Sequence, residues 1–135
     1  MRQITVQAVS GNCEKVIEFV NECLDELGCT QKARLQLDIA VDEVFGNITR
    51  YAYAPGTGDA TIRAEASKGG AAVTLTFIDS GIPYNPLEHP DPDVGLSAKE
   101  RDIGGLGIYM VKKITDELEY EHTQGKNILR ITKKL

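Results

Sequence analysis

Apolar residues in the N-terminal part of the chain change from a period of two to a helical spacing. Residues 3–9 alternate, with Ile4, Val6 and Ala8 on one face, and this alternation predicts a strand. Two helices are predicted next: one begins after Asn12 as its N-cap and ends at Gly28, and the other runs from about residue 30 to residue 53. Their apolar stripes consist of Val16, Val20, Cys23, Leu24 and Leu27 in the first helix, and of Leu37, Val41, Val44, Phe45, Ile48 and Ala52 in the second.

A period of two returns in residues 60–67 and 71–79, which flank a Lys-Gly-Gly turn and so predict a hairpin. Val73 and Phe77 alternate with Thr74 and Thr76, as expected of an antiparallel sheet that has one face in water. Two more alternating stretches, one from residue 117 and one from about residue 126 to residue 133, predict two final strands.

Residues 82–103 show no apolar period and contain four prolines. A structureless loop of this length is uncommon inside a compact domain, and such loops often serve as lids. A glycine cluster follows, and then a predicted helix of about residues 106–115. The order β-α-α-β-β-lid-α-β-β predicts a single α+β domain over residues 1–135. We expect a two-layer sandwich with a mostly antiparallel, mixed sheet and three helices on one face.

Composition narrows the class of protein. The length of 135 residues fits one domain, and no stretch approaches the ~18 consecutive apolar residues of a membrane span. A net charge of −5 argues against a general affinity for nucleic acid or for an anionic membrane. The three cysteines form no C-x-x-C pair, and the start of the chain lacks the apolar run of a signal peptide. We therefore expect free thiols and a cytoplasmic protein.

Glu43 and Asn47 lie four residues apart in the second predicted helix, so both project from the same side. That side borders the apolar stripe. A carboxylate and a carboxamide in this position can coordinate Mg²⁺ or order a water molecule. A solvated pair on the helix surface is the alternative interpretation.

Asp79 ends the second strand of the predicted hairpin and shares its apolar face with Leu75 and Phe77. A carboxylate that points toward a core needs a hydrogen-bond donor, and the exocyclic amine of a nucleotide base would be a fitting one. The other interpretation is a turn aspartate that accepts a hydrogen bond from its own backbone before Gly81. The pattern does not separate the two.

Gly104, Gly105, Leu106 and Gly107 lead into the last predicted helix. Glycines let backbone N–H groups approach phosphate oxygens, and a helix N-terminus favours negative charge. No Gly-Lys-Ser/Thr follows, so this is not a P-loop. The predicted lid could add a cation for a terminal phosphate, although solvated loop charges would have the same pattern. Its titratable residues include His89, Lys99, Glu100 and Arg101.

The order of these features resembles the ATPase superfamily of gyrase, heat-shock chaperone, sensor histidine kinase and mismatch-repair proteins. Asp79 follows Glu43 by 36 residues, and 25 more lead to Gly104. Within that superfamily, segments 38–53, 79–84 and 104–112 resemble the anti-sigma-factor serine kinases, and the similarity covers essentially the whole chain.

The resemblance implies a role for each candidate residue. Glu43 would be the general base that takes the proton of a substrate hydroxyl, and Asn47 would hold the Mg²⁺ that bridges the phosphates of ATP. Asp79 would accept a hydrogen bond from the adenine amine, and Gly81 would give the base room. Backbone N–H groups of the segment Gly104, Gly105, Leu106 and Gly107 would bind the phosphates. Without a P-loop lysine, ATP binding should require Mg²⁺.

The resemblance also implies protein partners. The substrate would be a serine or threonine of an anti-sigma-factor antagonist, and a homodimer of the kinase would hold a sigma factor inactive. One departure concerns the base, because Gln124-Gly125-Lys126-Asn127 stands where many relatives have threonine after glycine. This substitution leaves one hydrogen bond to adenine unassigned.

Two other interpretations remain. The catalytic domain of a sensor histidine kinase would have to act on a separate protein, because the chain has no room for phosphoacceptor helices. A non-catalytic module would use nucleotide only as a structural ligand while it binds a regulator. Glu43 favours a kinase over such a module, since a module has no chemical need for a base at that position.

Overall fold

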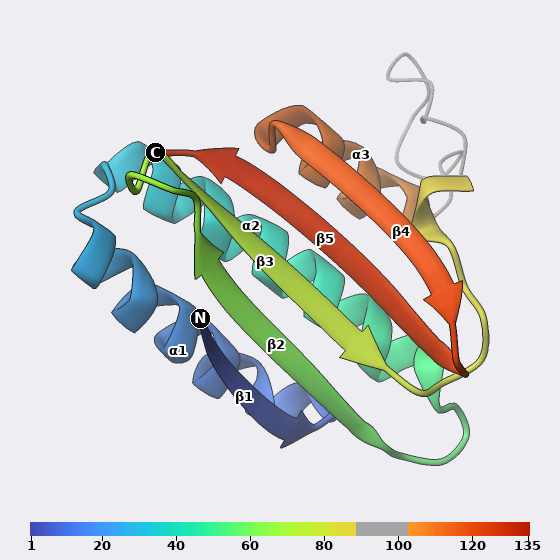
Figure 1. The fold of residues 1–135 in the computed structure, drawn as a ribbon. Helices are drawn as coiled ribbons and strands as arrows, with labels where there is room; N and C mark the ends of the chain where they lie inside the picture. Colours follow the sequence, from blue (N-terminus) through green and yellow to red (C-terminus); the bar gives the residue numbers. More distant parts are fainter. Residues whose placement is uncertain (89–102) are drawn as a thin grey trace.

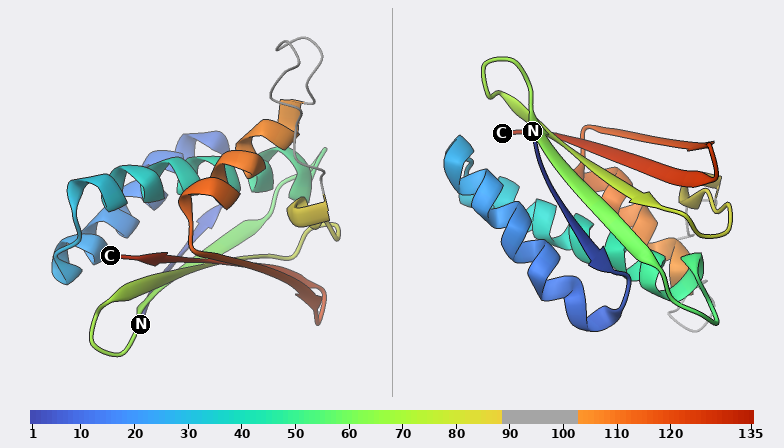
Figure 2. Two further views of the ribbon diagram at one scale, coloured as in Figure 1. Left: turned by 90° about the horizontal axis from the view of Figure 1, so that it is seen from above. Right: turned by 60° about the horizontal axis from the view of Figure 1, so that its bottom comes forward.

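The structure, a computed structural model, describes residues 1–88 and 103–135, and its strands join in one sheet of order β1-β2-β3-β5-β4 (Figure 1). The strands are β1 (Arg2–Gln7), β2 (Asp59–Ala66), β3 (Ala72–Asp79), β4 (Glu117–Thr123) and β5 (Lys126–Lys134). The α-helices α1 (Cys13–Leu27), α2 (Gln31–Asn47) and α3 (Ile103–Ile114) all lie on one face of the sheet (Figure 2). The predicted two-layer α+β sandwich is confirmed.

The core lies between the helices and the inner face of the sheet, where the period-two positions meet the helical stripes. In α1, Val16, Val20 and Leu24 are fully buried, and Phe19, which the predicted stripe did not include, is buried with them. The remaining large buried side chains include Leu37, Val41 and Phe45 from α2, Ile62, Leu75 and Phe77 from β2 and β3, and Val111 and Ile131 from α3 and β5. Burial of such side chains contributes ~1.5–3 kcal/mol each.

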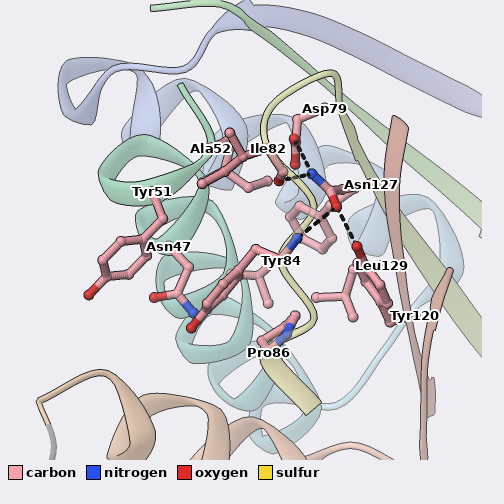
Figure 3. A pocket seen from close by; sticks show the side chains of 13 residues that line it. Asn47, Tyr51, Ala52, Asp79, Ile82, Tyr84, Pro86, Tyr120, Asn127 and Leu129 are labelled. Carbon is pink, nitrogen blue, oxygen red and sulfur yellow. Dashed lines mark hydrogen bonds between the residues drawn. The ribbon is translucent and has the colours of Figure 1, made fainter. Parts of the chain in front are cut away.

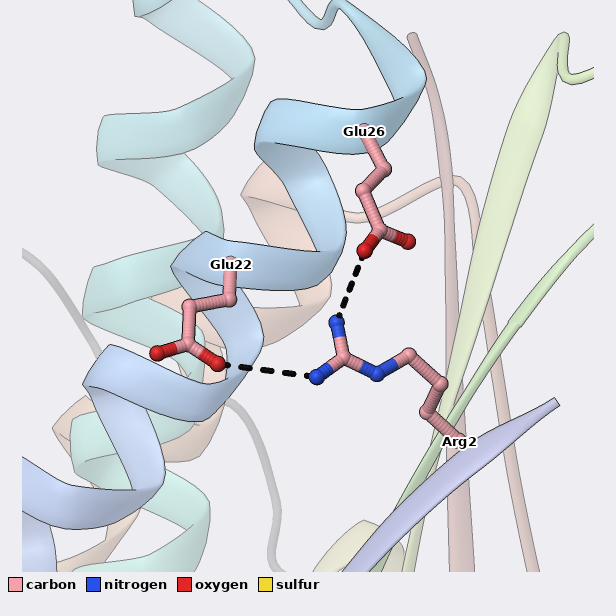
Figure 4. Close-up of polar contacts among 3 residues, drawn as sticks. All are labelled: Arg2, Glu22 and Glu26. Atoms are coloured by element: carbon pink, nitrogen blue, oxygen red, sulfur yellow. Dashed lines mark hydrogen bonds and ion pairs between the residues drawn. The ribbon is translucent and has the colours of Figure 1, made fainter.

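Specific residues end α1, begin α2 and link α1 to β1. The Thr30 hydroxyl accepts a hydrogen bond from the Ala33 N–H at 3.1 Å and so caps the start of α2. Gly28 ends α1 in the left-handed conformation, with φ 68°. Arg2 of β1 forms ion pairs with Glu26 at 3.2 Å and with Glu22 at 3.5 Å on α1 (Figure 4). These exposed ion pairs are each worth at most ~1 kcal/mol, so the apolar core holds the layers together.

α2 continues into a π-helical turn, η2 (Ile48–Ala52). This turn extends the helical segment to residue 52, close to the predicted end at residue 53. Single π-turns are often found at functional sites. Here the turn directs Tyr51 and Ala52 toward the end of β3, where the candidate site lies.

Three expectations are wrong in detail. The sheet is not mixed, because every strand pair in residues 1–88 and 103–135 is antiparallel. For β2–β3 and β4–β5 this direction follows from their short hairpin connections. Asn12 occupies the N-cap position of α1 without accepting a hydrogen bond there, since its amide donates to the Gln7 carbonyl at 2.8 Å. The predicted lid is not without structure, because Pro86–Glu88 form a 3-10 turn, η3.

Candidate functional site

A cavity opens where α2 and η2 meet the ends of β3, β4 and β5 (Figure 3). Its water-accessible volume is about 40 Å³. It is lined by Val44, Asn47, Ile48, Tyr51 and Ala52 from the helix, by Phe77, Asp79, Ile82, Tyr84 and Pro86 from β3 and the following loop, and by Tyr120, Asn127 and Leu129 from β4 and β5. The lining is mostly apolar with a few polar groups, as in small-molecule sites.

Asp79 lies at the base of this cavity and is only 6% exposed. Its Oδ1 accepts hydrogen bonds from the Gly81 N–H at 2.9 Å and from the Asn127 amide at 2.9 Å. Its Oδ2 accepts none from the residues that the structure describes. The turn interpretation is confirmed for Oδ1, which accepts from the Gly81 N–H. The interaction with the amine of a nucleotide base stays a prediction.

Asn127, noted in the sequence only as a departure, is also 6% exposed. It lies directly opposite Asp79 in the β3–β5 pairing. Its amide also donates to the Ile82 carbonyl at 2.8 Å, and its Oδ1 accepts from the Tyr84 N–H at 3.2 Å and from the Tyr120 hydroxyl (Figure 3). The sequence pattern gave no signal for this network, because it depends on the register of β3 against β5.

Two tyrosines of the cavity, Tyr84 and Tyr120, have a pKa above the usual value and remain protonated at neutral pH. Burial raises the pKa of Tyr84, and the neighbouring Tyr51 adds to the shift. Burial also raises the pKa of Tyr120, while a backbone hydrogen bond from Tyr84 lowers it in part. The rings of Tyr51 and Tyr84 approach each other to 5.6 Å between centroids, so they form an aromatic wall beside Asn47.

Asn47 and Glu43 differ in burial although both project from the same side of α2. Asn47 is 7% exposed and lines the cavity, which excludes the solvated interpretation for this residue. Its Oδ1 accepts a hydrogen bond from the Arg50 guanidinium at 2.8 Å. Glu43 is half-buried and lines a second, polar cavity of about 190 Å³. Thus Asn47 faces one cavity and Glu43 faces the next.

The second cavity lies between α2 and the start of α1 and contains both acidic and basic side chains. It is lined by Ser10, Cys13, Asp42, Glu43, Phe45, Gly46, Thr49 and Arg50. The Cys13 thiol donates to Asp42 Oδ1 at 3.3 Å. Burial, followed by the contact with Asp42, raises the pKa of Cys13 to about 11. The thiol is therefore protonated at neutral pH, and its thiolate, the nucleophilic form, is disfavoured.

Gly107 brings α3 against Glu43. A Cβ at position 107 would lie 2.0 Å from Glu43 Oε2, so only glycine at this position leaves room for the carboxylate in its observed conformation. The glycine segment lies inside α3 rather than before it, because the helix begins at Ile103, three residues earlier than predicted. Low helix propensity of glycine accounts for the misplaced boundary. The first N–H groups of α3 still lack hydrogen-bond partners within the helix.

Close packing requires glycine at position 81, which the sequence pattern did not indicate. A Cβ at this position would lie 2.2 Å from the Ala52 carbonyl oxygen, which accepts a hydrogen bond from the Ile82 N–H at 2.9 Å. The loop after β3 crosses η2 this closely only because residue 81 has no side chain. The predicted lid residues His89, Lys99, Glu100 and Arg101 lie outside the described residues.

Residues 6–133 match the family described as "Histidine kinase-like ATPase domain". The chain belongs to this family. Two solved structures share the fold at 18% identity. The RsbU and RsbW domains of a Mycobacterium tuberculosis protein cover 100% of this chain and 33% of their own, with a TM-score of 0.67. The Acinetobacter baumannii histidine kinase AdeS covers 99% of this chain and 68% of its own, with a TM-score of 0.52.

Curated relatives agree with the predicted resemblance to the anti-sigma-factor kinases. The serine/threonine-protein kinase BtrW of Bordetella bronchiseptica is 28% identical over 101 residues, which are 75% of this chain and 70% of the relative. The anti-sigma F factors of Thermoanaerobacter sp. and Caldanaerobacter subterraneus are each 33% identical over 95 residues, 70% of this chain. The aligned part spans 65% of the length of these two relatives. The names of these relatives confirm the predicted family.

Proposed function

We propose that this chain is a Mg-ATP-dependent serine/threonine kinase that acts on a protein substrate. The observation that carries the proposal is the arrangement along one helix: Asn47 lines the cavity that also holds Asp79, and Glu43, one turn earlier, contacts the first turns of α3. The groups for base recognition, metal binding and proton removal would thus lie side by side along α2. The name of the Bordetella relative supports a kinase of the serine/threonine class.

The nucleotide base would enter the cavity beside Asp79, whose Oδ2 can accept a hydrogen bond from the adenine amine. The cavity is well below the ~150 Å³ that admits a benzene molecule. Adenine therefore requires movement of lining side chains, and the Tyr51–Tyr84 wall is the part whose residues lie outside the strands. Aromatic rings in this position can stack on the base.

Asn47 is a suitable Mg²⁺ ligand, because a buried carboxamide oxygen that faces a cavity is a hard oxygen donor with two lone pairs. The bound ion would neutralise phosphate charge during transfer. The first N–H groups of α3, which include those of Gly104 and Gly105, would hold the phosphate oxygens. The predicted role of Leu106 and Gly107 is not proposed, because a helix that begins at Ile103 uses their N–H groups internally.

Glu43 would accept the proton of the substrate serine or threonine hydroxyl. The hydroxyl oxygen then forms a bond to the γ-phosphorus, and the bond from that phosphorus to the β–γ bridging oxygen breaks to release ADP. A general base contributes ~10²–10⁴-fold to such a step. The half-buried position of Glu43, with a polar cavity in front of it, would let a substrate side chain approach.

The partners of the proposed kinase follow from its relatives named anti-sigma F factor. We propose that a homodimer of the chain binds a sigma factor and phosphorylates the corresponding antagonist in the cytoplasm. The net charge of −5 is consistent with a protein partner rather than nucleic acid. Among the described residues, no helix combines the length and apolar character of a membrane span.

One observation favours the alternative of a non-catalytic nucleotide-binding module. Arg50 donates to the same Asn47 oxygen that would bind Mg²⁺, so the ion has to share or replace this contact. A module that binds a regulator without transferring phosphate would tolerate the arrangement.

Transfer of labelled γ-phosphate from Mg-ATP to the antagonist encoded nearest the gene separates these functions. Glu43→Gln keeps the size of the side chain and removes the base, so transfer should fall by ~10²-fold or more while ATP affinity is unchanged. Asp42→Asn is the matched control, because it removes the adjacent carboxylate of the same cavity and should leave transfer intact. ATP binding and partner binding without any transfer by the wild type would establish the module instead.

A further inference from the structure

We propose that Asn127 is a positioning residue for nucleobase selection: it fixes the Asp79 carboxylate so that one oxygen alone is presented to the base. The inference rests on the proposed function and extends it to the base that the site selects. A base with an exocyclic amine at the position of Asp79 Oδ2 would be accepted, and a base with a carbonyl oxygen there would be rejected.

The hydrogen bonds of Asn127 use the whole side chain. Its two amide hydrogens are directed to Asp79 Oδ1 at 2.9 Å and to the Ile82 carbonyl at 2.8 Å. Its oxygen accepts from the Tyr84 N–H and from the Tyr120 hydroxyl, which matches the two lone pairs of a carboxamide oxygen. A fully bonded Asn127 has no group left for a ligand, so it acts on the base through Asp79.

Asp79 is fixed in the same way. Its Oδ1 accepts from both the Gly81 N–H and the Asn127 amide, which hold the plane of the carboxylate. Its Oδ2 remains an acceptor without a donor of its own in the cavity that residues 1–88 and 103–135 define. An ionised carboxylate oxygen accepts and cannot donate, so it discriminates an amine from a carbonyl.

The pairing of strands places these groups together. Asp79 and Asn127 face each other across β3 and β5, while Tyr120 lies on β4 two residues before His122, the partner of Asn127 in the sheet. A two-residue turn, Gln124-Gly125, with φ of 52° and 74°, sets the register between β4 and β5. The arrangement is thus fixed by backbone pairing rather than by mobile side chains.

Threonine in place of Asn127 could not build the same arrangement. A hydroxyl has a single hydrogen, so it can donate to Asp79 or to the Ile82 carbonyl but not to both. The loop carbonyl would then lose its donor, and Tyr120 and Tyr84 would compete for a shorter side chain. In this chain the amide connects the carboxylate, the loop after β3 and the tyrosine of β4 (Figure 3).

Binding of Mg-ATP and Mg-ITP tests the proposal, because the two nucleotides differ at the purine 6-position, an amine in one and a carbonyl in the other. The wild type should prefer ATP by at least about tenfold. Asn127→Ala should weaken ATP by about tenfold, the effect of one hydrogen bond to a charged group, while ITP changes little. The ratio of the two dissociation constants therefore falls.

Two outcomes would overturn different claims. If the wild type binds neither nucleotide, the proposed function itself fails. If folded Asn127→Ala loses ATP and ITP affinity equally, or keeps the wild-type ratio, Asn127 is only structural and the inference is wrong. Asn127→Thr and Tyr120→Phe provide the same test should the alanine variant not fold, since each removes part of the network and should lower the ratio by a smaller factor.

Asn85→Ala is the matched control. Its carboxamide belongs to the same loop and accepts from the Leu87 N–H at 2.9 Å, but it has no hydrogen bond to Asp79. This variant should leave the ATP-to-ITP ratio unchanged. A fall in the ratio equal to that of Asn127→Ala would assign selectivity to loop rigidity in general and would overturn the role of Asn127.

Discussion

At the base end of the proposed site, Asp79 and Asn127 are both 6% exposed and are hydrogen-bonded across paired strands. At the phosphate end, Glu43 is half-buried and Arg50 is exposed, and both project from the single helical segment α2–η2. Backbone pairing fixes the position of the first two residues. Glu43 instead lies against Gly107 of the neighbouring helix α3.

This difference indicates which property of the protein each end controls. The base end is built into the fold, so changes there should affect folding and nucleotide choice together. The phosphate end depends on side chains outside the apolar core, since Glu43 is half-buried and Arg50 is exposed, and substitutions at such positions cost little stability. We therefore expect variants at the phosphate end to separate catalysis from stability, and variants at the base end to couple them.

Gly81→Ala should have the largest effect, and it tests the coupling at the base end. The added Cβ would lie 2.2 Å from the Ala52 backbone oxygen, which cannot rotate away. We expect a loss of ~1–3 kcal/mol in the free energy of unfolding, together with weaker ATP binding, since the loop that holds Asp79 must move. Urea unfolding and ATP titration measure the two effects.

Gly11→Ala is the control for this prediction, because a Cβ there meets no atom within 4 Å. Its free energy of unfolding should stay within ~0.5 kcal/mol of the wild type. A stable Gly81→Ala protein with normal ATP affinity would show that the loop is not held by its passage over η2.

Gly107→Ala should impair phosphotransfer at the phosphate end without the loss of stability expected for Gly81→Ala. The new Cβ meets the far end of the Glu43 side chain, which can rotate but then leaves its position. Phosphotransfer should fall by ~10²-fold, the effect of a displaced catalytic group. The free energy of unfolding should hold or rise by up to ~1 kcal/mol, because alanine favours a helix interior over glycine.

Thermal unfolding and the labelled-phosphate assay on the same preparation decide this case. Full transfer by Gly107→Ala would mean that the observed position of Glu43 does not matter to the reaction. A joint loss of stability and transfer would mean that the two ends are not built differently.

The sequence predicted most of the fold because apolar period and turn chemistry are local properties. The stripe around Val41 and Phe45, the αL stop at Gly28 and the hairpin of β2 and β3 all follow from neighbouring residues. Glu43, Asn47 and Asp79 could be selected for the same reason, since helical spacing and strand alternation determine the direction of their side chains.

The missed features depend on contacts between distant segments. Asn127 bonds to Asp79 across 48 residues, and only the register of β3 and β5 brings them together. The need for glycine at position 81 comes from η2, a turn that no local pattern indicated. The contact of Arg50 with Asn47 spans only three residues and could have been read from helical spacing.

Arg50→Ala should have a smaller effect, limited to the Mg²⁺ requirement of ATP binding. Arg50 donates to Asn47 Oδ1 at 2.8 Å, and a hydrogen bond of this kind contributes ~1 kcal/mol. If the guanidinium competes with Mg²⁺ for that oxygen, its removal should lower the Mg²⁺ concentration needed for half-maximal ATP binding by about fivefold. Arg63→Ala, on the outer face of β2, is the control and should leave this concentration unchanged. A higher Mg²⁺ requirement would instead show that Arg50 holds Asn47 in the orientation that the metal needs.

Asp38→Asn should have the smallest effect and should leave both ends of the site unchanged. Asp38 on α2 and Asn21 on α1 each have a buried Oδ1 without a hydrogen-bond partner in the described part of the chain. Burial raises the pKa of Asp38 above its usual 3.8, against the lowering influence of Asn21 and Arg34. Because the folded state holds this proton more tightly than the unfolded state, ionised Asp38 opposes folding.

The penalty of ionised Asp38 is absent below the unfolded pKa of 3.8 and fully present above the raised pKa of the folded state. Asp38→Asn should therefore stabilise the protein at pH 7 by about 0.5 kcal/mol, a small value because water reaches part of the carboxylate. The gain should shrink as the pH falls toward 4. Urea unfolding of both proteins at pH 7 and pH 4 measures this change, and an equal gain at the two pH values would assign it to packing instead. Asp38 lies away from the cavity of Asp79 and Asn127, so Asp38→Asn should leave the ATP-to-ITP ratio and the Mg²⁺ requirement at their wild-type values. A change in either value would mean that the contact between α1 and α2 is coupled to the nucleotide site.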